Sequence, residues 1–181
     1  MAKMLEKLNA RLKSFIKDQH MFFVATAAED GRINLSPKGG DYIKIIDDKK
    51  VVWMNLTGSG NESAAHVLQQ NRMTIMFCAF DGDPLILRLY GSATAYHERD
   101  ATYQEYISLF GPHEGARQIF EMQLDSVQTS CGFAVPLMSY DKDRDILDKW
   151  SADKGRDGIH AYWKEKNLKS IDGLETRIIE D

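Results

Sequence analysis

The chain has 181 residues, of which 43% are hydrophobic and 28% are charged, and its formal net charge at pH 7 is −4. These values are typical of a globular protein of one domain with a full hydrophobic core, and the acidic balance excludes the basic surface of a nucleic-acid-binding protein. The longest apolar runs fall far short of the roughly 20 residues that a membrane-spanning helix needs. With two cysteines, no C-x-x-C spacing and no secretory signal, we expect a soluble cytoplasmic protein without a metal site or disulfide framework.

The first half of the chain predicts one helix followed by short strands. Apolar residues at helical spacing indicate an amphipathic helix within residues 1–19. Four runs rich in β-preferring residues follow: MFFVATAA, INLSPK, DYIKII and VVWMN. The Asp-Gly pair after the first run is typical of a β-hairpin. A helix is expected over residues 62–70, with Asn61 or Ser59 as its cap.

The second half predicts further strands and several helices. MTIMFCAF and LILRLYGSATAY are expected to be strands, the second with a bulge or bend at Gly91. Residues 100–110 and 114–122 are expected to be helical, and SVQTSCGFAVP is expected to return to the sheet. Two polar helices, near 143–153 and 157–166, complete the pattern.

This order of elements predicts the fold class. Successive strands with a helix inserted after the fourth, and helices at both ends, indicate an α+β protein with a six-stranded antiparallel barrel, closed or partly closed. The order argues against alternating βαβ units. We expect a single domain made of an N-terminal helix (1–19), the barrel (20–140) and a C-terminal helical extension (141–181).

The stretch NLTGSGNESAAH, residues 55–66, is a candidate binding loop. Its two glycines permit close backbone approach, and the free N–H groups at the start of the following helix favour an anion. Hydroxyl groups on Thr57, Ser59 and Ser63 add donors that suit phosphate oxygens. The spacing matches neither a P-loop nor G-x-G-x-x-G. Considered alone, the loop is equally well interpreted as a flexible connection to a capped helix.

Positive side chains on two predicted strands strengthen the anion hypothesis. Ser36 and Lys38 lie on one face of their strand, because strand side chains alternate. A lysine in such a run needs an anionic partner or an exposed position. Arg88 interrupts the aliphatic run LILRLYG, where a buried guanidinium favours a carboxylate or phosphate. A solvent-facing lysine and a structural arginine pair remain open alternatives.

Other distinctive residues are predicted to be structural. His66 is expected on the polar side of its helix, exposed to solvent and loosely paired with a nearby glutamate. Cys131 is expected to be a small buried core residue. Trp150, Tyr162 and Trp163, at helical spacing, are expected to pack over one end of the barrel.

The order of FFVATAAEDGRINLSPKGGD, VVWMNLTGSGNESAAHVLQQNRMTIMFCAF and LILRLYGSATAY resembles the pyridoxamine 5′-phosphate oxidase-like family, the FMN-binding split barrels, over roughly residues 20–97. The resemblance implies a split barrel, a homodimer, and FMN bound in a cleft between the subunits. It implies that Arg88 reaches the flavin of the other subunit. The cofactor-binding residues that it implies are Ser36, Lys38, Asn55, Thr57, Ser59, Asn61, Ser63 and Arg88.

The chain departs from the authentic oxidase at two places in this pattern. Ser36 stands where the oxidase carries an arginine, and the loop has NES where the oxidase has a Ser-Arg-Lys run. The charge of a phosphate would therefore be met by Lys38, Arg88 or Arg72. The C-terminal SIDGLETRIIED also lacks the histidine and tryptophan with which the oxidase holds its vitamin B6 substrate, so that activity is not expected.

These features predict an FMN-binding flavoprotein, an oxidoreductase that passes hydride or electrons between a reduced donor and an unidentified small molecule. Because the flavin would carry the redox chemistry, the prediction names no catalytic residue. The alternatives are a non-catalytic barrel that binds or senses flavin or haem, a deazaflavin-dependent reductase, and a ligand-free dimeric barrel. The only macromolecular partner expected is a second copy of the chain, with no nucleic acid or membrane.

Overall fold

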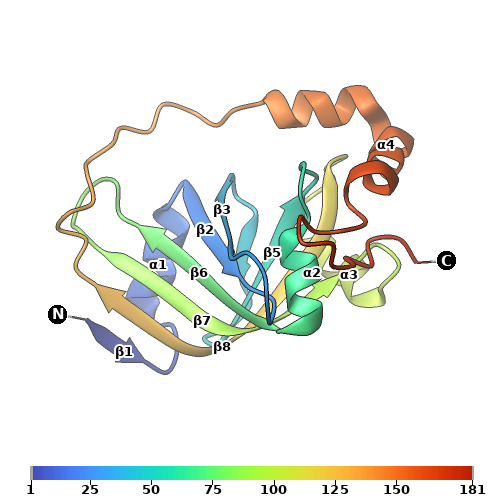
Figure 1. The fold of residues 1–181 in the computed structure, drawn as a ribbon. Helices are drawn as coiled ribbons and strands as arrows, with labels where there is room; N and C mark the ends of the chain where they lie inside the picture. The colour runs from blue at the N-terminus through green and yellow to red at the C-terminus, as the bar shows by residue number, and fades with distance from the viewer. Residues whose placement is uncertain (1, 181) are drawn as a thin grey trace.

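The computed structural model describes residues 2–180 and has an α+β fold built on one curled antiparallel sheet (Figure 1). The 8-stranded sheet contains β1 (Lys3–Leu5), β2 (Met21–Thr26), β3 (Asn34–Gly39), β4 (Ile43–Ile45), β5 (Lys50–Leu56), β6 (Arg72–Cys78), β7 (Ile86–Tyr96) and β8 (Ala116–Ser130). The helices of the described chain are α1 (Ala10–Asp18), α2 (Glu62–Gln69), α3 (Ala101–Ile107) and α4 (Ile146–Lys166).

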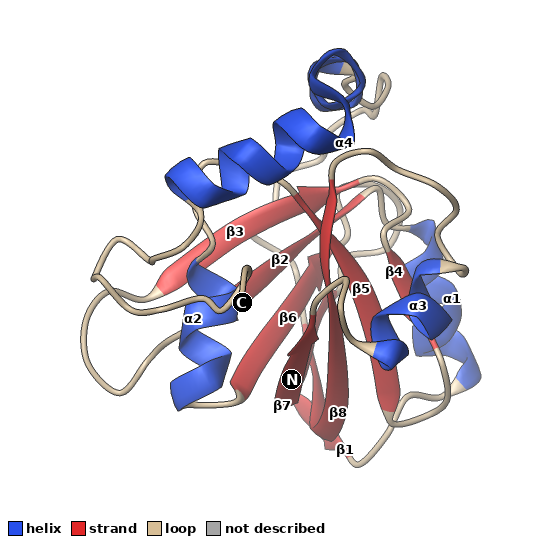
Figure 2. Ribbon diagram, turned by 90° about the vertical axis from the view of Figure 1, so that its right-hand side faces the viewer, coloured by secondary structure: helices blue, strands red, loops and turns tan. Residues whose placement is uncertain are grey.

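The sheet is an incompletely closed barrel. Its strand order is β3-β2-β6-β7-β8-β5-β4, with β1 beside β8, and Figure 2 shows the strands curling around a shared interior. Strand β3 pairs with β2, and β4 pairs with β5, so these two strands lie at the ends of the path. The side chains of Lys38 on β3 and Asn55 on β5 nevertheless meet at 3.2 Å. The expected α+β class and partly closed antiparallel sheet are therefore confirmed.

The sheet has eight strands, not the six expected. Lys3–Leu5, assigned to the first helix by its apolar spacing, pairs with β8, and α1 begins only at Ala10. Residues 114–122, expected to be helical, contribute to β8, which pairs with β5 on one side and β7 on the other. The helix expected after VVWMN forms as predicted, although it follows the fifth strand because β1 precedes the others.

Aromatic and aliphatic side chains fill the interior of the curled sheet. Phe22, Trp53, Ile75, Leu89 and Phe120 are all buried in one continuous cluster. The rings of Trp53 and Phe120 stack with centroids 4.5 Å apart, and both strands that carry them border the candidate site described below. The core therefore fixes β5 and β8 against each other close to that site.

Gly91 lies at the irregularity predicted in the long strand β7. The register between β7 and β8 shifts between Tyr90 and Gly91. A Cβ atom at Gly91 would lie 1.9 Å from the carbonyl oxygen of Gln123, so a larger residue would force the two strands apart.

The C-terminal part of the chain crosses the molecule and returns to the barrel. Strand β8 ends at Ser130, so Cys131 is exposed instead of lying in the core as expected. The two helices predicted near the C-terminus are the arms of α4, which kinks at Gly155, where φ is 61°. After α4, residues 167–180 turn back toward α2 (Figure 1). Within residues 2–180, no helix is both long and apolar enough to cross a membrane.

Candidate anion-binding site

A cavity of about 390 Å³ lies where β3, the end of β5 and the start of α2 meet. Its volume is within the range of small-molecule sites. Most of the predicted cofactor-binding residues line this cavity: Ser36, Lys38, Asn55, Ser59, Asn61 and Ser63. The polar side chains of β3 and of the loop after β5 therefore meet at one cavity.

Two of the predicted residues do not line the cavity. The hydroxyl of Thr57 donates a hydrogen bond to the carbonyl of Gly115 at 2.9 Å and accepts one from the Trp163 indole at 2.9 Å. Thr57 therefore holds the loop in place, and its donor is not available to a ligand. Arg88 lies on β7 and donates to the hydroxyl of Ser130 at 3.2 Å. Arg72, the other alternative cation, is exposed on β6 and is also outside the cavity.

Lys38 reaches the cavity from β3 without forming an ion pair in the described chain. Its ammonium group donates to Asn55 Oδ1 at 3.2 Å and lies 5.4 Å from the centre of the Trp53 ring. Burial, and secondarily the positive charge of Arg117, lower the pKa of Lys38 to about 8. The low pKa reflects an ammonium group that has lost water and has gained no negative partner.

Arg117, on β8, is the second cation of the cavity. Its guanidinium is buried and bonds only to neutral acceptors: Gln118 Oε1 at 3.1 Å, Gly60 O at 2.9 Å, Asn167 Oδ1 at 2.8 Å and, at 3.5 Å, Gly58 O. Burial lowers the pKa of Arg117 to about 9, so the side chain remains charged at neutral pH. The sequence did not identify this residue, because the segment that carries it was expected to be a helix.

Buried amides connect the two cations. Asn55 accepts from Lys38 and donates through Nδ2 to Gln118 Oε1 at 3.0 Å, the same oxygen that accepts from Arg117 Nε. Gln118 Nε2 in turn donates to Asn61 Oδ1 at 3.0 Å. Each amide therefore has one consistent orientation, set by its partners. The network holds both positive groups in position while adding no negative charge.

The start of α2 adds hydrogen-bond donors on the other side of the cavity. Asn61 occupies the N-cap position, as expected, but its side chain makes no capping bond to the helix and instead bonds to Gln118 and Asn167. The first-turn N–H groups of α2 therefore have no side-chain acceptor from the cap, and they carry the positive end of the helix dipole. Such an arrangement favours an anion.

His66 supports Ser63 from within the core. The sequence placed His66 in solvent, but its ring is buried and its Nδ1 lies 3.1 Å from Thr26 Oγ1. Thr26 Oγ1 is 3.3 Å from Ser63 Oγ, which also accepts from Asn34 Nδ2 at 3.3 Å. When the imidazole proton is on Nδ1, the nitrogen that has a partner, His66 donates to Thr26 Oγ1. The Thr26 hydroxyl then donates to Ser63 Oγ. The hydroxyl hydrogen of Ser63 is then free to point into the cavity.

Glu62 is the acidic residue on the rim of the cavity, and its carboxylate is turned to the C-terminal segment. Both of its oxygens lie 3.1 Å from the backbone nitrogen of Ile171. Neither Lys38 nor Arg117 forms an ion pair among the described residues. Burial is the larger effect on the pKa of Arg117 and lowers it, whereas the negative charge of Glu62 acts to raise it, so the charge of the guanidinium is only partly compensated. A phosphate ester is an anion that both charges and the hydroxyl donors can bind.

A larger hollow of about 600 Å³ lies between α1 and the β3–β4 connection. Its lining includes Lys17, Lys44, Asp41 and Asp143, and Lys44 pairs with Asp41 at 2.5 Å. Because its charges are mixed and partly paired, this hollow lacks the uncompensated positive charge of the smaller cavity. In the described part of the chain, no group of three His, Cys, Asp or Glu side chains could hold a metal ion.

Comparisons with known proteins identify relatives of the chain. A family model described as pyridoxamine 5′-phosphate oxidase matches residues 8–131. Over 187 aligned residues the chain is 33% identical to the pyridoxamine 5′-phosphate oxidase family protein ustO of Aspergillus flavus, covering 93% of this chain and 75% of that protein.

Solved structures share the fold. HupZ of Group A Streptococcus has a TM-score of 0.55 at 20% identity, covering 66% of this chain and 91% of that chain. A putative pyridoxamine 5′-phosphate oxidase of Lactobacillus delbrueckii has a TM-score of 0.54 at 16% identity, covering 68% of this chain and 94% of that chain. At these identities the likeness concerns the fold alone.

Proposed function

The chain belongs to the pyridoxamine 5′-phosphate oxidase family, and from this premise we propose that it is an FMN-binding flavoprotein whose anion site holds the 5′-phosphate. The observation that carries the proposal is the pair of cations, Lys38 and Arg117, that face one cavity and form no ion pair among the described residues. An uncompensated charge in a desolvated position is costly, and a bound phosphate would offset that cost.

The donor set fits a phosphate monoester. Lys38 supplies a point charge, Arg117 a guanidinium, and Ser63 a hydroxyl that can donate into the cavity when it accepts from Thr26 as well as from Asn34. The loop at Gly58 adds a stretch of backbone that a ligand can approach closely, because a Cβ atom there would meet no neighbouring atom within 4 Å. These groups bind and orient the phosphate end, and the residues of the amide network keep the two cations at a fixed separation.

We propose that the protein is an oxidoreductase. The isoalloxazine ring of FMN, when bound, supplies hydride or electron transfer between a reduced donor and a small acceptor. The contribution of this chain is to bind, to orient and to limit access of water, so an acid–base dyad is not required. Activity on the vitamin B6 substrate is not part of the proposal.

A homodimer forms part of this proposal. Large apolar side chains are exposed on the β2–β3 hairpin, with Ile33 77% and Leu35 64% exposed, and separately on the segment after β8, with Phe133 82% exposed. Ile33 and Leu35 are close in sequence, and an exposed apolar patch favours a protein–protein interface. Arg88, which lies outside the cavity of its own chain, would then be free to serve the cavity of the partner.

The test is to purify the protein, release any bound cofactor by denaturation, and identify it by mass spectrometry. We expect FMN at one equivalent per chain, and reduction of the bound flavin by NADH or NADPH. Release of a deazaflavin or haem would show that this molecule, and not FMN, is the cofactor. FMN binding without turnover would indicate a storage or sensing role. A preparation that contains no flavin and does not bind added FMN would show that the proposal is wrong.

A further inference from the structure

The segment that follows α4 is attached to the anion-binding loop by several hydrogen bonds. Asn167 Nδ2 donates to Gly58 O at 3.0 Å, and Asn61 Nδ2 donates to Asn167 O at 3.3 Å. The Ile171 N–H faces the Glu62 carboxylate at 3.1 Å. These pairs join parts of the chain that are more than 100 residues apart, with separations of 106, 109 and 109 residues. The segment lies outside residues 8–131, the part matched by the family model.

Asn167 is the residue of this segment that reaches the site itself. Its side chain is fully buried, at 0% exposure. Its Oδ1 accepts from Arg117 Nη1 at 2.8 Å while its Nδ2 donates to Gly58 O, so the orientation of the amide is fixed from both sides. The same Nη1 also donates to Gly60 O at 2.9 Å. Asn167 therefore links the guanidinium to the loop that would surround the anion.

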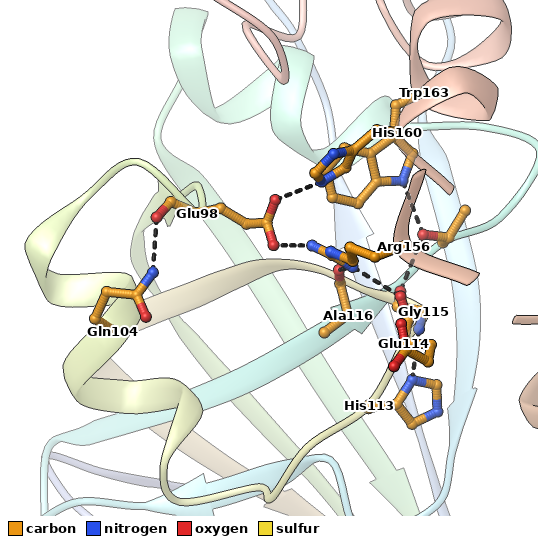
Figure 3. Close-up of polar contacts among 10 residues, drawn as sticks. Glu98, Gln104, His113, Glu114, Gly115, Ala116, Arg156, His160 and Trp163 are labelled. Atoms are coloured by element: carbon orange, nitrogen blue, oxygen red, sulfur yellow. Dashed lines mark hydrogen bonds and ion pairs between the residues drawn. The ribbon is translucent and has the colours of Figure 1, made fainter. Parts of the chain in front are cut away.

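The position of Asn167 is secured from α4. Arg156 donates to the carbonyls of Glu114 at 2.7 Å and Ala116 at 2.8 Å, next to Arg117 in sequence. Figure 3 shows Glu98 between Arg156 and His160, with the Trp163 indole beside them. The guanidinium of Arg156 lies 4.8 Å from the centre of the Trp163 ring. The second arm of α4, which begins after the kink at Gly155, is therefore anchored to the start of β8, the strand that carries Arg117.

The chemical type of the acceptor matters as much as its position. An aspartate at the place of Asn167 would form an ion pair with Arg117 and reduce the positive potential in the cavity. An amide oxygen accepts the same hydrogen bond and leaves the full charge available to a ligand. All the acceptors of Arg117 in the described chain share this property, since they are amide or peptide carbonyl oxygens.

We propose that Asn167 is a positioning residue of the anion site. It orients the Arg117 guanidinium without neutralising its charge, so the C-terminal segment contributes to anion binding. The inference rests on the proposed function in one respect, that the anion is the phosphate of FMN. Its general form requires only that the two cations bind an anion. Binding of a simple inorganic anion therefore tests the role of Asn167 separately from the proposal that the anion is the phosphate of FMN.

The experiment compares Asn167→Asp with the wild type by calorimetric titration of FMN and, separately, of inorganic sulfate, which stays a dianion across the pH range used. We expect the variant to bind both at least tenfold more weakly at pH 8. The difference should narrow as the pH falls and the new carboxyl is protonated. Because the carboxylate also takes the place of the Nδ2 donor to Gly58 O, the free energy of unfolding of the ligand-free variant is measured at the same pH values. Anion affinity should change with pH by more than this stability does, which a merely structural role would not produce.

Trp163→Phe is the matched control, because it removes the hydrogen bond to Thr57 from the same part of the chain and leaves the charges of the cavity unchanged. We expect any loss of affinity in this variant to be independent of pH, because no charge in the cavity has changed. If Asn167→Asp does not fold, Asn167→Leu replaces it in the comparison. The leucine variant must then weaken sulfate binding more than Trp163→Phe does.

The outcomes separate the two proposals. Equal affinities in Asn167→Asp and the wild type across the pH range would overturn the role of Asn167, as would a loss that is independent of pH and matched by Trp163→Phe. Binding of sulfate but not FMN by the wild type would reject the flavin proposal and leave Asn167 to be judged on sulfate. A wild-type protein that binds neither would reject both.

Discussion

Replacing Arg117 with methionine removes one of the two charges in the cavity while keeping a side chain of similar length. In the wild type the guanidinium is one of two groups able to form a charge-assisted hydrogen bond to the phosphate. Loss of such a bond costs about 1.5–3 kcal/mol, so the dissociation constant of FMN should rise roughly tenfold to 150-fold. Calorimetric titration of the ligand-free protein measures this change directly.

The stability of the ligand-free protein should change much less, because two effects oppose each other. Gly58 O and Gln118 Oε1 keep donors from Asn167 and Asn55. The carbonyl of the exposed Gly60 and the buried Asn167 Oδ1 each lose a hydrogen bond from Arg117. An unsatisfied buried acceptor costs about 1–3 kcal/mol. Removal of a desolvated charge offsets part of that cost. We therefore expect a net change within about 2 kcal/mol in the free energy of unfolding.

Thermal unfolding with and without FMN combines these effects in one assay. At an FMN concentration of about 100 times the wild-type dissociation constant, binding adds about 2.7 kcal/mol, which for a domain of this size raises Tm by roughly 5–11 °C. If affinity falls about 100-fold, the same concentration adds only about 0.4 kcal/mol, a shift of about 1–2 °C.

Arg72→Met is the control for Arg117→Met, since Arg72 is exposed and lies outside the cavity. It should retain the full shift in Tm on addition of FMN. If Arg117→Met binds FMN as tightly as the wild type, the assignment of the anion site to this cavity is refuted. A loss of affinity in Arg72→Met equal to that in Arg117→Met would show instead that net charge, not the cavity, controls binding.

Three further changes test other parts of the site. Burial holds the pKa of Lys38 near 8, below its ordinary 10.5, so the unfolded chain binds more protons between these values and the ligand-free protein should become more stable as the pH rises through that window. Denaturant titrations at several pH values should show a steeper rise in the wild type than in Lys38→Met, where only the lowered pKa of Arg117 still contributes. Lys38→Met should also bind FMN roughly ten- to a hundredfold more weakly, and an unchanged affinity would remove Lys38 from the site. Gly60→Val places a Cβ atom 3.3 Å from Glu62 Oε1 and adds bulk beside the cavity, so flavin content should fall, and a fully loaded variant would show that the loop is only a connection. Arg88→Ala should lose flavin while light scattering still reports a dimer, and full retention of flavin would exclude a contribution of Arg88 across the subunits.

Residues 114–122 were predicted to be helical, but residues 116–122 lie in β8, and Arg117 was therefore not identified. In β8 every residue from Ala116 to Phe120 is buried, because this strand is paired on both sides and covered on both faces. A strand of that kind does not alternate between apolar and polar residues, so its apolar positions can match helical spacing. The helix prediction placed Arg117 on no defined face, and the second cation of the cavity was therefore missed.

His66 and Cys131 were misplaced for a related reason. Each position was interpreted from its neighbours in sequence, whereas burial depends on what packs against it. The face of α2 that carries His66 meets β2, where Thr26 supplies a hydrogen-bond partner. Cys131 lies just beyond the last residue of β8, so the apolar run around it continues outside the sheet.

The sequence by itself determined the local features: the strands around the Asp-Gly hairpin, the bulge at Gly91, the common face of Ser36 and Lys38, and the polar loop before α2. These follow from side-chain alternation and glycine freedom, which act over a few residues. Only the tertiary structure decided that Lys38 meets a neutral amide instead of an acid, and that Arg117 and Asn167 join it. Contacts between residues 17 to 109 positions apart depend on how the sheet curls and where the chain returns, and no local pattern encodes that geometry.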